Sequence, residues 1–273
     1  MMEYLIAVDM EGVHGVFGEP YNVSVYAVGV GTESYAKAVA AATQEVNIVV
    51  NALFEKGATR VLVWDNHGAR DNLDFSKIDP RAEKLVLDRT KGRLTFLSDF
   101  NFAGIVFIGY HSRAGSVNGI MAHTYNGMDI QYMKINGKQV GEFDIDSFIA
   151  SEYNVPPLFV ASDDVCVGQV LEHSPKTVTV VTKIGKGRRR GIPREESEVL
   201  KEIDAGVREA VGREIEPIKL TFPCPFEIRY SSMDVAEWKM EELSKQFPEL
   251  HYGEDAHTLQ VTLQSVDDLR PFL

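Results

Sequence analysis

The sequence predicts an α/β protein with a three-layer α/β/α core around a mostly parallel sheet, plus a small C-terminal α+β region. Apolar runs at residues 4–8, 60–65 and 104–109 are interrupted by helical or loop patterns, and the runs are apolar at nearly every position. Strands buried on both faces of a parallel sheet have this composition. Alternation of such strands with helices favours helices on both faces of one sheet. Further strands are expected at residues 84–87, 158–160 and 177–181.

The clearest helical pattern covers residues 33–56. Apolar side chains recur there at steps of three and four, and polar side chains occupy the opposite face. Gly57 follows and is expected to end the helix, because glycine readily adopts the left-handed conformation found at helix C-termini. The preceding segment, to about residue 32, is expected to be a loop. A surface helix is also expected at residues 195–211.

A β-hairpin is predicted by Asn136-Gly137, which lies between the strand-like segments 131–135 and 138–140. Asn-Gly favours the type I′ turn that joins two neighbouring antiparallel strands. Glu142 follows at the expected start of another helix.

After Pro217 the pattern changes to short strands around one helix. The expected strands are residues 219–222, 227–230 and 258–263, and the expected helix is 235–245. No flexible linker marks a boundary. We therefore expect a single domain over residues 1–273, with an α/β core at 1–185 and a C-terminal region of a helix and small strands at 186–273.

The composition favours a globular protein and argues against two classes of partner. The chain has 273 residues, 44% of them hydrophobic, which is enough for a large packed core. Its 40 acidic and 28 basic side chains give a formal net charge of -12, so nucleic acid and anionic membranes would be repelled. Cys166 and Cys224 are too few for a disulfide framework. With no apolar run of membrane-spanning length and no secretion signal, a cytoplasmic protein is expected.

Carboxylates and histidines collect in the loops that follow the predicted strands. Asp9 and Glu11 follow the first strand, His67 follows the second, and His111 follows the run at 104–109. His123, in Met121-Ala122-His123-Thr124, is also expected in a loop that leaves a strand. If the sheet is parallel, these loops converge on one edge. Imidazole nitrogens and carboxylate oxygens are the ligands that zinc and similar divalent ions take in catalytic sites.

The spacing of Asp9 and Glu11 also suits a metal site. Residues two apart on an extended segment project to the same side, so both carboxylates can face one metal centre and one of them can bridge two ions. Each residue alone has a simpler interpretation, because an Asp after a strand often caps a helix or forms a turn and a lone His is usually just hydrogen-bonded. The hypothesis therefore depends on the whole set.

Five motifs resemble, in the same order, those of the D-aminopeptidase family of dinuclear zinc peptidases. The resemblance is clear over about residues 1–165 and looser beyond them. The motifs are Asp9-Met10-Glu11-Gly12, Asp65-x-His67, Gly109-Tyr110-His111-x-Arg113-Ala114, Met121-x-His123, and Asn136-Gly137 followed by Val140-Gly141-Glu142.

The resemblance implies two zinc ions per subunit, bridged by Asp9. Glu11 and His67 would complete one site, and His111 and Glu142 the other. Each ion would then have three protein ligands, which leaves positions open for water and substrate, as in catalytic rather than structural zinc sites.

His123 is similar in position to the residue that the family is thought to use as its nucleophile, so the resemblance implies a catalytic role. A neutral imidazole beside two cations could attack a polarised amide carbonyl or shuttle a proton. A water activated by the metals could attack instead, with His123 as acid-base partner or oxyanion donor. The sequence does not choose between these roles.

An aminopeptidase must also receive the α-ammonium group of its substrate. Asp65, Asp163 and Asp164 are candidates by loop position, although capping of the next helix is the favoured interpretation for the last two. The basic segment 183–191 could bind a peptide carboxylate, but it lacks a phosphate-loop motif, and a solvated loop or a subunit contact is favoured. His14 is not needed by the metal count, and surface or packing roles are expected for His173, His251 and His257.

The resemblance implies a catalytic domain that hydrolyses the N-terminal residue, a D-amino acid such as D-Ala, from short peptides or amides. Family members assemble into large rings, so a homo-oligomer is also expected. One alternative is a two-metal phosphoesterase, because paired ions can clamp an in-line phosphoryl displacement. Another is a non-catalytic peptide-binding transport component, which fits less well because such a protein needs a secretion signal.

Overall fold

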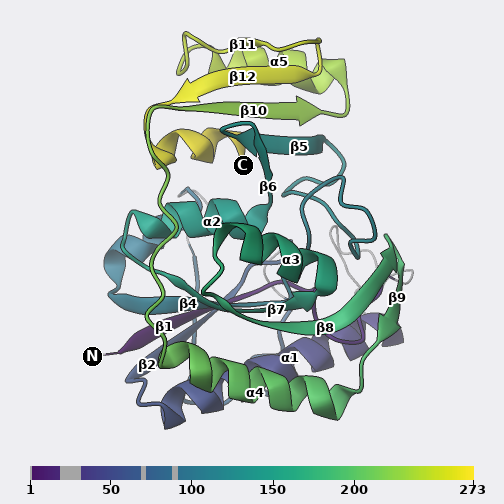
Figure 1. The fold of residues 1–273 in the computed structure, drawn as a ribbon, viewed down its shortest axis with the longest axis vertical. Helices are drawn as coiled ribbons and strands as arrows, with labels where there is room; N and C mark the ends of the chain where they lie inside the picture. The colour runs from purple at the N-terminus through teal and green to yellow at the C-terminus, as the bar shows by residue number, and fades with distance from the viewer. Residues whose placement is uncertain (1, 19–31, 69–71, 88–91) are drawn as a thin grey trace.

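The computed structural model describes residues 2–18, 32–68, 72–87 and 92–273. Its larger sheet has seven strands in the order β3-β2-β1-β4-β7-β8-β9 (Figure 1). The strands are β1 (Glu3–Val8), β2 (Arg60–Asp65), β3 (Glu83–Lys84), β4 (Phe102–Ile108), β7 (Pro157–Asp163), β8 (Val178–Gly187) and β9 (Arg190–Pro193). Neighbouring strands pair in parallel except β8 and β9, which are antiparallel. The predicted mostly parallel sheet is confirmed.

Each face of this sheet packs against its own hydrophobic core, as strands without a polar face require. Along β1, Leu5 and Ala7 belong to one core, and Ile6 and Val8 belong to the other. This alternation follows from the period of two along a strand. Both cores continue into helices, so the sheet is the middle layer of the predicted three.

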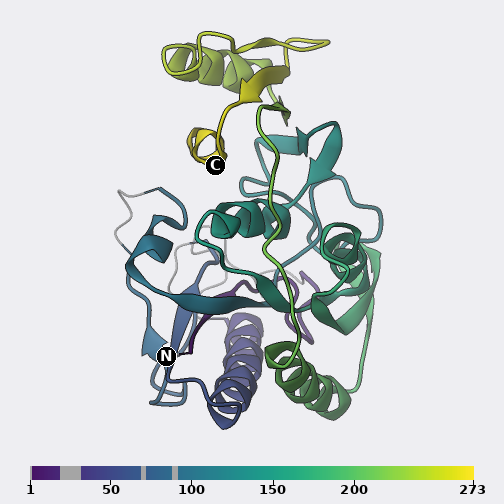
Figure 2. The same ribbon diagram turned by 60° about the vertical axis from the view of Figure 1, so that its left-hand side comes forward.

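Helices cover both faces of the large sheet (Figure 2). They are α1 (Glu33–Glu55) and α4 (Glu196–Val211) on one face, and α2 (Glu142–Ser151) and α3 (Asp164–His173) on the other. The start of α1 is capped by the Thr32 hydroxyl, which accepts the Tyr35 N–H at 3.2 Å. Gly57 follows its last turn with a φ of 93°, as the sequence predicts.

A smaller antiparallel sheet lies on the α2 side of the large sheet (Figure 1). Its order is β11-β12-β10-β5-β6. The strands are β5 (Ile130–Ile135), β6 (Lys138–Val140), β10 (Cys224–Tyr230), β11 (His251–Tyr252) and β12 (Thr258–Leu263). Helix α5 (Met233–Leu243) packs on β10 and β12, and the 3-10 helix η2 (Val266–Phe272) lies between β12 and α2. A second 3-10 helix, η1 (Thr95–Asp99), precedes β4.

The small sheet joins two distant parts of the chain. Its β5–β6 hairpin turns at Asn136 and Gly137, whose φ angles of 52° and 75° confirm the predicted type I′ turn. The expected C-terminal region, residues 186–273, is divided between the two sheets. Strand β9 is part of the large sheet and α4 packs on that sheet, whereas β10, β11 and β12 are part of the small sheet.

Two predicted strands differ in the structure. The strand expected at 84–87 is only the two-residue edge strand β3, after which Leu85 N makes one more hydrogen bond, of 2.9 Å, to Val63 O. The strand expected at 219–222 is wrong, because this segment belongs to an extended connection between α4 and β10 that forms no strand (Figure 1). Leu220 and Phe222 pack partly buried against the core, which explains their alternating pattern.

The expected loop before α1 is described only up to residue 18, and residues 19–31 lie outside the described residues. Within the described parts of the chain, no helix combines the length and the apolar character needed to cross a membrane.

Candidate metal centre

The ends of β1, β2 and β4 lie side by side at the carboxyl edge of the large sheet. From β1 the chain builds the sheet outward in both directions, with β2 and β3 on one side and β4, β7 and β8 on the other. The loops that follow β1 and its neighbours therefore diverge at this point of the sheet. Open α/β sheets bind ligands in the crevice that such diverging loops leave. Asp9 follows β1, His67 follows β2 and His111 follows β4.

The five predicted ligands come together there in two groups that share Asp9. One group is Asp9, Glu11 and His67, and the other is Asp9, His111 and Glu142. Within each group the possible ligand atoms lie within 4.8 Å of one another. All five residues are buried, with exposed fractions between 2% and 6%.

The donor atoms of these groups suit a divalent cation. His111 Nε2 is buried without a hydrogen-bond partner among the described residues, and it lies 3.2 Å from Glu142 Oε1 and 3.6 Å from Asp9 Oδ2. In the other group, His67 Nε2 lies 3.4 Å from Glu11 Oε1. Three carboxylates buried together need compensating positive charge, because they have lost their hydration. Imidazole nitrogen and carboxylate oxygen are zinc donors.

The pKa values in the cluster reflect the same excess of negative charge. Burial and the charge of Glu11 raise the pKa of Asp9 well above its usual range. Burial opposes protonation of His67 and His111, but the charges of Glu11 and Glu142 raise the pKa of each imidazole to about 10. Without a metal, the two histidines therefore carry protons at neutral pH and partly neutralise the carboxylates.

Two glycines allow the ends of β1 and β4 to approach closely. Gly12 N donates to Gly109 O at 2.6 Å. A Cβ atom at Gly12 would lie 2.1 Å from Tyr110 O, and one at Gly109 would lie 2.1 Å from Asp9 O. Gly109 also has a φ of 72°, a conformation that favours glycine. A side chain at either position would move Asp9 and His111 apart.

Glu142 is positioned by the start of α2, where the sequence predicts a helix to begin. Gly141 is the N-cap residue, and its N–H donates to Asp144 Oδ2 at 2.8 Å. The Tyr125 N–H donates to Glu142 Oε1 at 2.7 Å. Burial would raise the pKa of Glu142, but the charge of His111 holds it at about 2. Glu142 is therefore ionised and available to a cation.

His123 lies beside this cluster and stacks on His111. Its Nδ1 is 2.9 Å from Met121 O and donates to that carbonyl, which can only accept. Its Nε2 faces Glu142 Oε1 at 3.7 Å. Burial and the charge of His111 lower the pKa of His123, so the ring is neutral with a free electron pair on Nε2. Glu11, His111 and His123 also form a possible ligand group.

Sequence reasoning misses a buried network behind the ligands. Asp146 lies one turn after Glu142 in α2 and accepts two hydrogen bonds from Arg93, at 2.5 and 2.7 Å. It also accepts the hydroxyls of Tyr110 at 2.8 Å and Tyr125 at 3.2 Å. The spacing of four residues between Glu142 and Asp146 is the signal that could have indicated a shared helix face. The loop position of Arg93 gives no such signal.

This network connects the loops that carry the ligands. Tyr110 directly precedes His111, and its hydroxyl accepts the side-chain amide of Asn66 at 3.0 Å. Asn66 in turn directly precedes His67. Hydrogen bonds of this kind orient metal ligands and are part of what fixes their geometry.

Asp163 and Asp164, two of the predicted receivers of a substrate ammonium group, bind backbone N–H groups instead. Asp163 Oδ1 accepts the Cys166 N–H at 2.8 Å and caps α3, and its Oδ2 accepts the Ile120 N–H at 2.9 Å. Asp164 Oδ1 accepts the Gly185 N–H at 2.7 Å. The capping interpretation is confirmed for Asp163.

Asp65, the third candidate, organises the loop that carries His67. Its Oδ2 accepts the Asn72 N–H at 2.6 Å, and its Oδ1 accepts the Asn72 side-chain amide at 3.0 Å. The same amide donates to His67 O at 2.7 Å. Asp65 therefore supports a ligand loop.

The other histidines have packing or surface contacts, as the sequence predicts. The ring of His14 lies 2.7 Å from Glu45 Oε1, and that of His173 lies 2.6 Å from Asp144 Oδ1. Two further rings contact backbone carbonyls, those of His251 and His257.

The basic segment 183–191 differs from the prediction of a solvated loop. It forms the end of β8, a turn and the start of β9. Lys183 is fully buried, whereas Lys186 and residues 188–190 are exposed.

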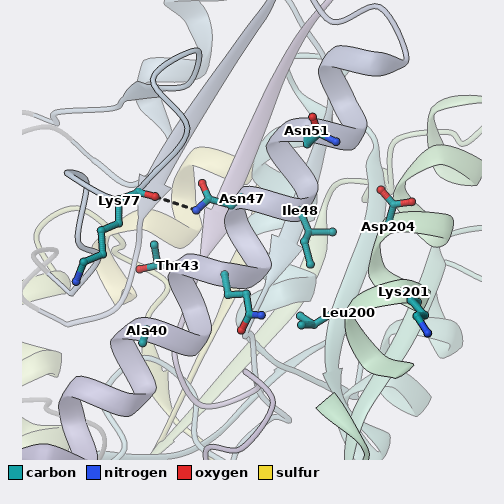
Figure 3. Close-up of a pocket in the computed structure, with 10 residues that line it drawn as sticks. Ala40, Thr43, Asn47, Ile48, Asn51, Lys77, Leu200, Lys201 and Asp204 are labelled. Carbon is teal, nitrogen blue, oxygen red and sulfur yellow. Dashed lines mark hydrogen bonds between the residues drawn. The ribbon is translucent and has the colours of Figure 1, made fainter. Parts of the chain in front are cut away.

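A hollow of about 800 Å³ lies elsewhere, between α1 and α4 (Figure 3). Its lining includes Asn47, whose side-chain amide donates to Lys77 O at 2.9 Å, and the charged Lys201 and Asp204. None of the predicted site residues reaches it. The candidate metal ligands therefore lie at the carboxyl edge of the large sheet and not in this hollow.

Comparison with known proteins places the chain in a family. A family model described as D-aminopeptidase matches residues 2–270. The chain belongs to this family. The resemblance stated from the sequence motifs is thus confirmed, and with it the assignment to a family of peptidases.

Two relatives extend the comparison. A D-aminopeptidase of Bacillus subtilis (strain 168) is 32% identical over 182 residues, which are 67% of this chain and 64% of the relative. The matched region thus spans less than two thirds of that curated protein. A solved structure described as the Zn-dependent D-aminopeptidase DppA from Bacillus subtilis, a self-compartmentalizing protease, superposes with a TM-score of 0.84 and 24% identity. It covers 99% of this chain and 94% of the other, which confirms the fold.

Proposed function

We propose that this protein is a zinc-dependent aminopeptidase that removes an N-terminal D-residue, such as D-Ala, from short peptides or amides. The observation that carries the proposal is the pair of three-residue groups sharing Asp9 at the carboxyl edge of the sheet. Family membership gives the reaction class. The description of the structural relative as a Zn-dependent D-aminopeptidase supports the metal and the stereochemistry.

In this proposal Asp9 would be shared by two zinc ions. Glu11 and His67 would hold one ion with it, and His111 and Glu142 would hold the other. Three protein ligands for each ion is the number found in catalytic zinc sites. When bound, the two ions supply Lewis-acid polarisation of the scissile carbonyl.

His123 supplies the remaining chemistry. Its Nδ1 is committed to Met121 O, so Nε2 is the atom that can take a proton or attack a carbonyl carbon. The stack on His111 keeps Nε2 beside the cluster. A lowered pKa keeps the imidazole neutral at pH 7, which both roles require. Asp65, Asp163 and Asp164 use carboxylate oxygens for backbone contacts, so the receiver of the α-ammonium group is sought among the cluster carboxylates.

The test is a substrate panel with zinc-loaded protein. Anilides of D-Ala and L-Ala, with matched N-acetylated forms, separate an aminopeptidase from a general amidase and report stereochemistry. We expect turnover of the free D-Ala anilide and little of the L-form or of either acetylated form. Hydrolysis of phosphate esters alone would replace the proposal with a phosphoesterase. Binding of D-peptides without turnover would replace it with a binding protein.

We also propose that the chain forms a homo-oligomer, because the structural relative is described as self-compartmentalizing. Light scattering coupled to gel filtration would test this. A mass of about one chain, 30.4 kDa, at micromolar concentration would contradict it.

A further inference from the structure

The basic β8–β9 hairpin reaches two segments of the proposed active site. Lys183, within β8, contacts the loop that follows β1. Arg188, in the turn, contacts the segment that carries His123. The first loop holds Glu11, so the hairpin links a proposed ligand and the proposed catalytic histidine.

Lys183 holds the loop after β1 through its ammonium group. Nζ donates to Glu11 O at 2.5 Å, to Val13 O at 2.7 Å and to Val16 O. Its charge also lies 5.4 Å from the centroid of the Phe17 ring, a cation–π contact. A lysine ammonium has three N–H donors, and here all three are used by carbonyl groups of one loop.

The same contacts exclude an anion-binding role for Lys183. Its side chain is fully buried, and its donors are saturated by the protein itself. A peptide carboxylate therefore finds no free donor there. What the ammonium does instead is fix the backbone of Glu11, whose carboxylate lies 3.4 Å from His67 Nε2.

Arg188 holds the segment around His123 from both its backbone and its side chain. Arg188 O accepts the Met121 N–H at 2.8 Å, and Nη1 donates to Ala122 O at 2.6 Å. Met121 has a φ of 49°, a strained conformation for a non-glycine residue that persists only where contacts impose it. Met121 O in turn accepts Nδ1 of His123. Arg188 thus fixes the group that orients the imidazole.

We propose that the β8–β9 hairpin is a positioning element of the active site, in which Lys183 positions Glu11 for metal binding and Arg188 positions His123 for catalysis. The inference rests on the proposed function and adds two residues to it. Both act through the backbone of other residues.

Substitution of Arg188 is expected to impair turnover, whereas substitution of Lys183 is expected to impair zinc binding. Arg188→Ala should lower kcat about 10- to 100-fold, the effect typical of losing an orienting partner, with KM and zinc content close to wild type. Arg190→Ala, which removes an exposed arginine of the same hairpin, should leave all three unchanged. Lys183→Met removes the donors but keeps an unbranched side chain only one atom shorter, and it should weaken zinc binding about 10- to 100-fold in a chelator competition.

The experiment measures kcat, KM, zinc affinity and thermal unfolding for the four proteins. Arg188→Ala with the kcat of Arg190→Ala would overturn the role of Arg188. Lys183→Met that folds and binds zinc as tightly as wild type would overturn the role of Lys183. If Lys183→Met does not fold, the Arg188 comparison decides the proposal. Wild-type protein that binds no zinc would overturn the proposed function itself, a result distinct from unchanged variants of a zinc-binding wild type.

Discussion

The imidazole of His123 stacks on that of His111, with ring centroids 3.8 Å apart and an angle of 14° between the ring planes. The stack joins a proposed metal ligand to a residue that the two main ligand groups leave free. It brings Nε2 of His123 within 3.7 Å of Glu142 without a hydrogen bond to it. The position therefore suits a group that acts on substrate beside the metals.

Replacement of His123 by alanine should keep both zinc ions and remove most turnover. Loss of a proton-transfer group at this position should lower kcat by about 10²- to 10⁴-fold. Steady-state kinetics and zinc analysis of the same sample check this. His251→Ala, which removes an exposed histidine, is the control. Unchanged turnover would exclude a catalytic role, and loss of one zinc ion would make His123 a ligand.

Zinc binding to the metal-free protein should release protons at pH 7. The pKa values of His67 and His111 are raised to about 10 without metal, so both are protonated, whereas a zinc-bound imidazole must be neutral. Zinc affinity should therefore rise with pH between about 6 and 8. Titration calorimetry in buffers with different ionisation enthalpies measures the release. A binding enthalpy independent of the buffer would contradict it.

The ligand cluster could be predicted from the sequence because it follows from strand order. Asp9, His67 and His111 lie one, two and three residues after the end of a strand, and parallel pairing brings such positions to one edge. The partners of the small sheet could not be predicted, because the pairing of β10 with β5 joins segments far apart in the chain. Local pattern carries no information about such contacts.

The burial of Lys183 could not be predicted from the sequence either. Lys183 lies in a segment rich in glycine and arginine, a composition typical of a solvated loop. Its burial is explained by three carbonyl acceptors that a distant loop contributes. The strand predicted at residues 219–222 is wrong because an alternating apolar pattern does not by itself require a strand partner. Its alternating apolar residues pack on the core as an unpaired connection.

Arg93→Met should strongly destabilise the protein. Arg93 makes a two-pronged ion pair with the fully buried Asp146, and its removal leaves that charge uncompensated. Breaking a buried pair in this way costs about 3 to 5 kcal/mol. The matched control is Arg194→Met, which breaks an exposed two-pronged pair with Glu202 and should cost at most about 1 kcal/mol. Equal urea midpoints for the two variants would show that the Arg93 pair is not stabilising.

His173→Gln should destabilise the protein more at pH 5.5 than at pH 8.5. The hydrogen bond to Asp144 raises the pKa of His173 above its usual value of 6.5. The stabilisation is complete below the unfolded pKa and is lost as the pH rises through the raised, folded value. The free energies of unfolding of wild type and variant should therefore converge at high pH. A difference that grows with pH would contradict this sign.

The number of zinc ions bound per chain tests the shared role of Asp9 most directly. Wild-type protein, saturated with zinc, should hold about two ions per chain by elemental analysis. Asp9→Ala should lose both, because each site loses one of its three ligands, whereas His67→Ala should lose only the ion bound with Glu11. Saturation of the wild type at one ion per chain, or two ions retained by Asp9→Ala, would contradict a bridged pair.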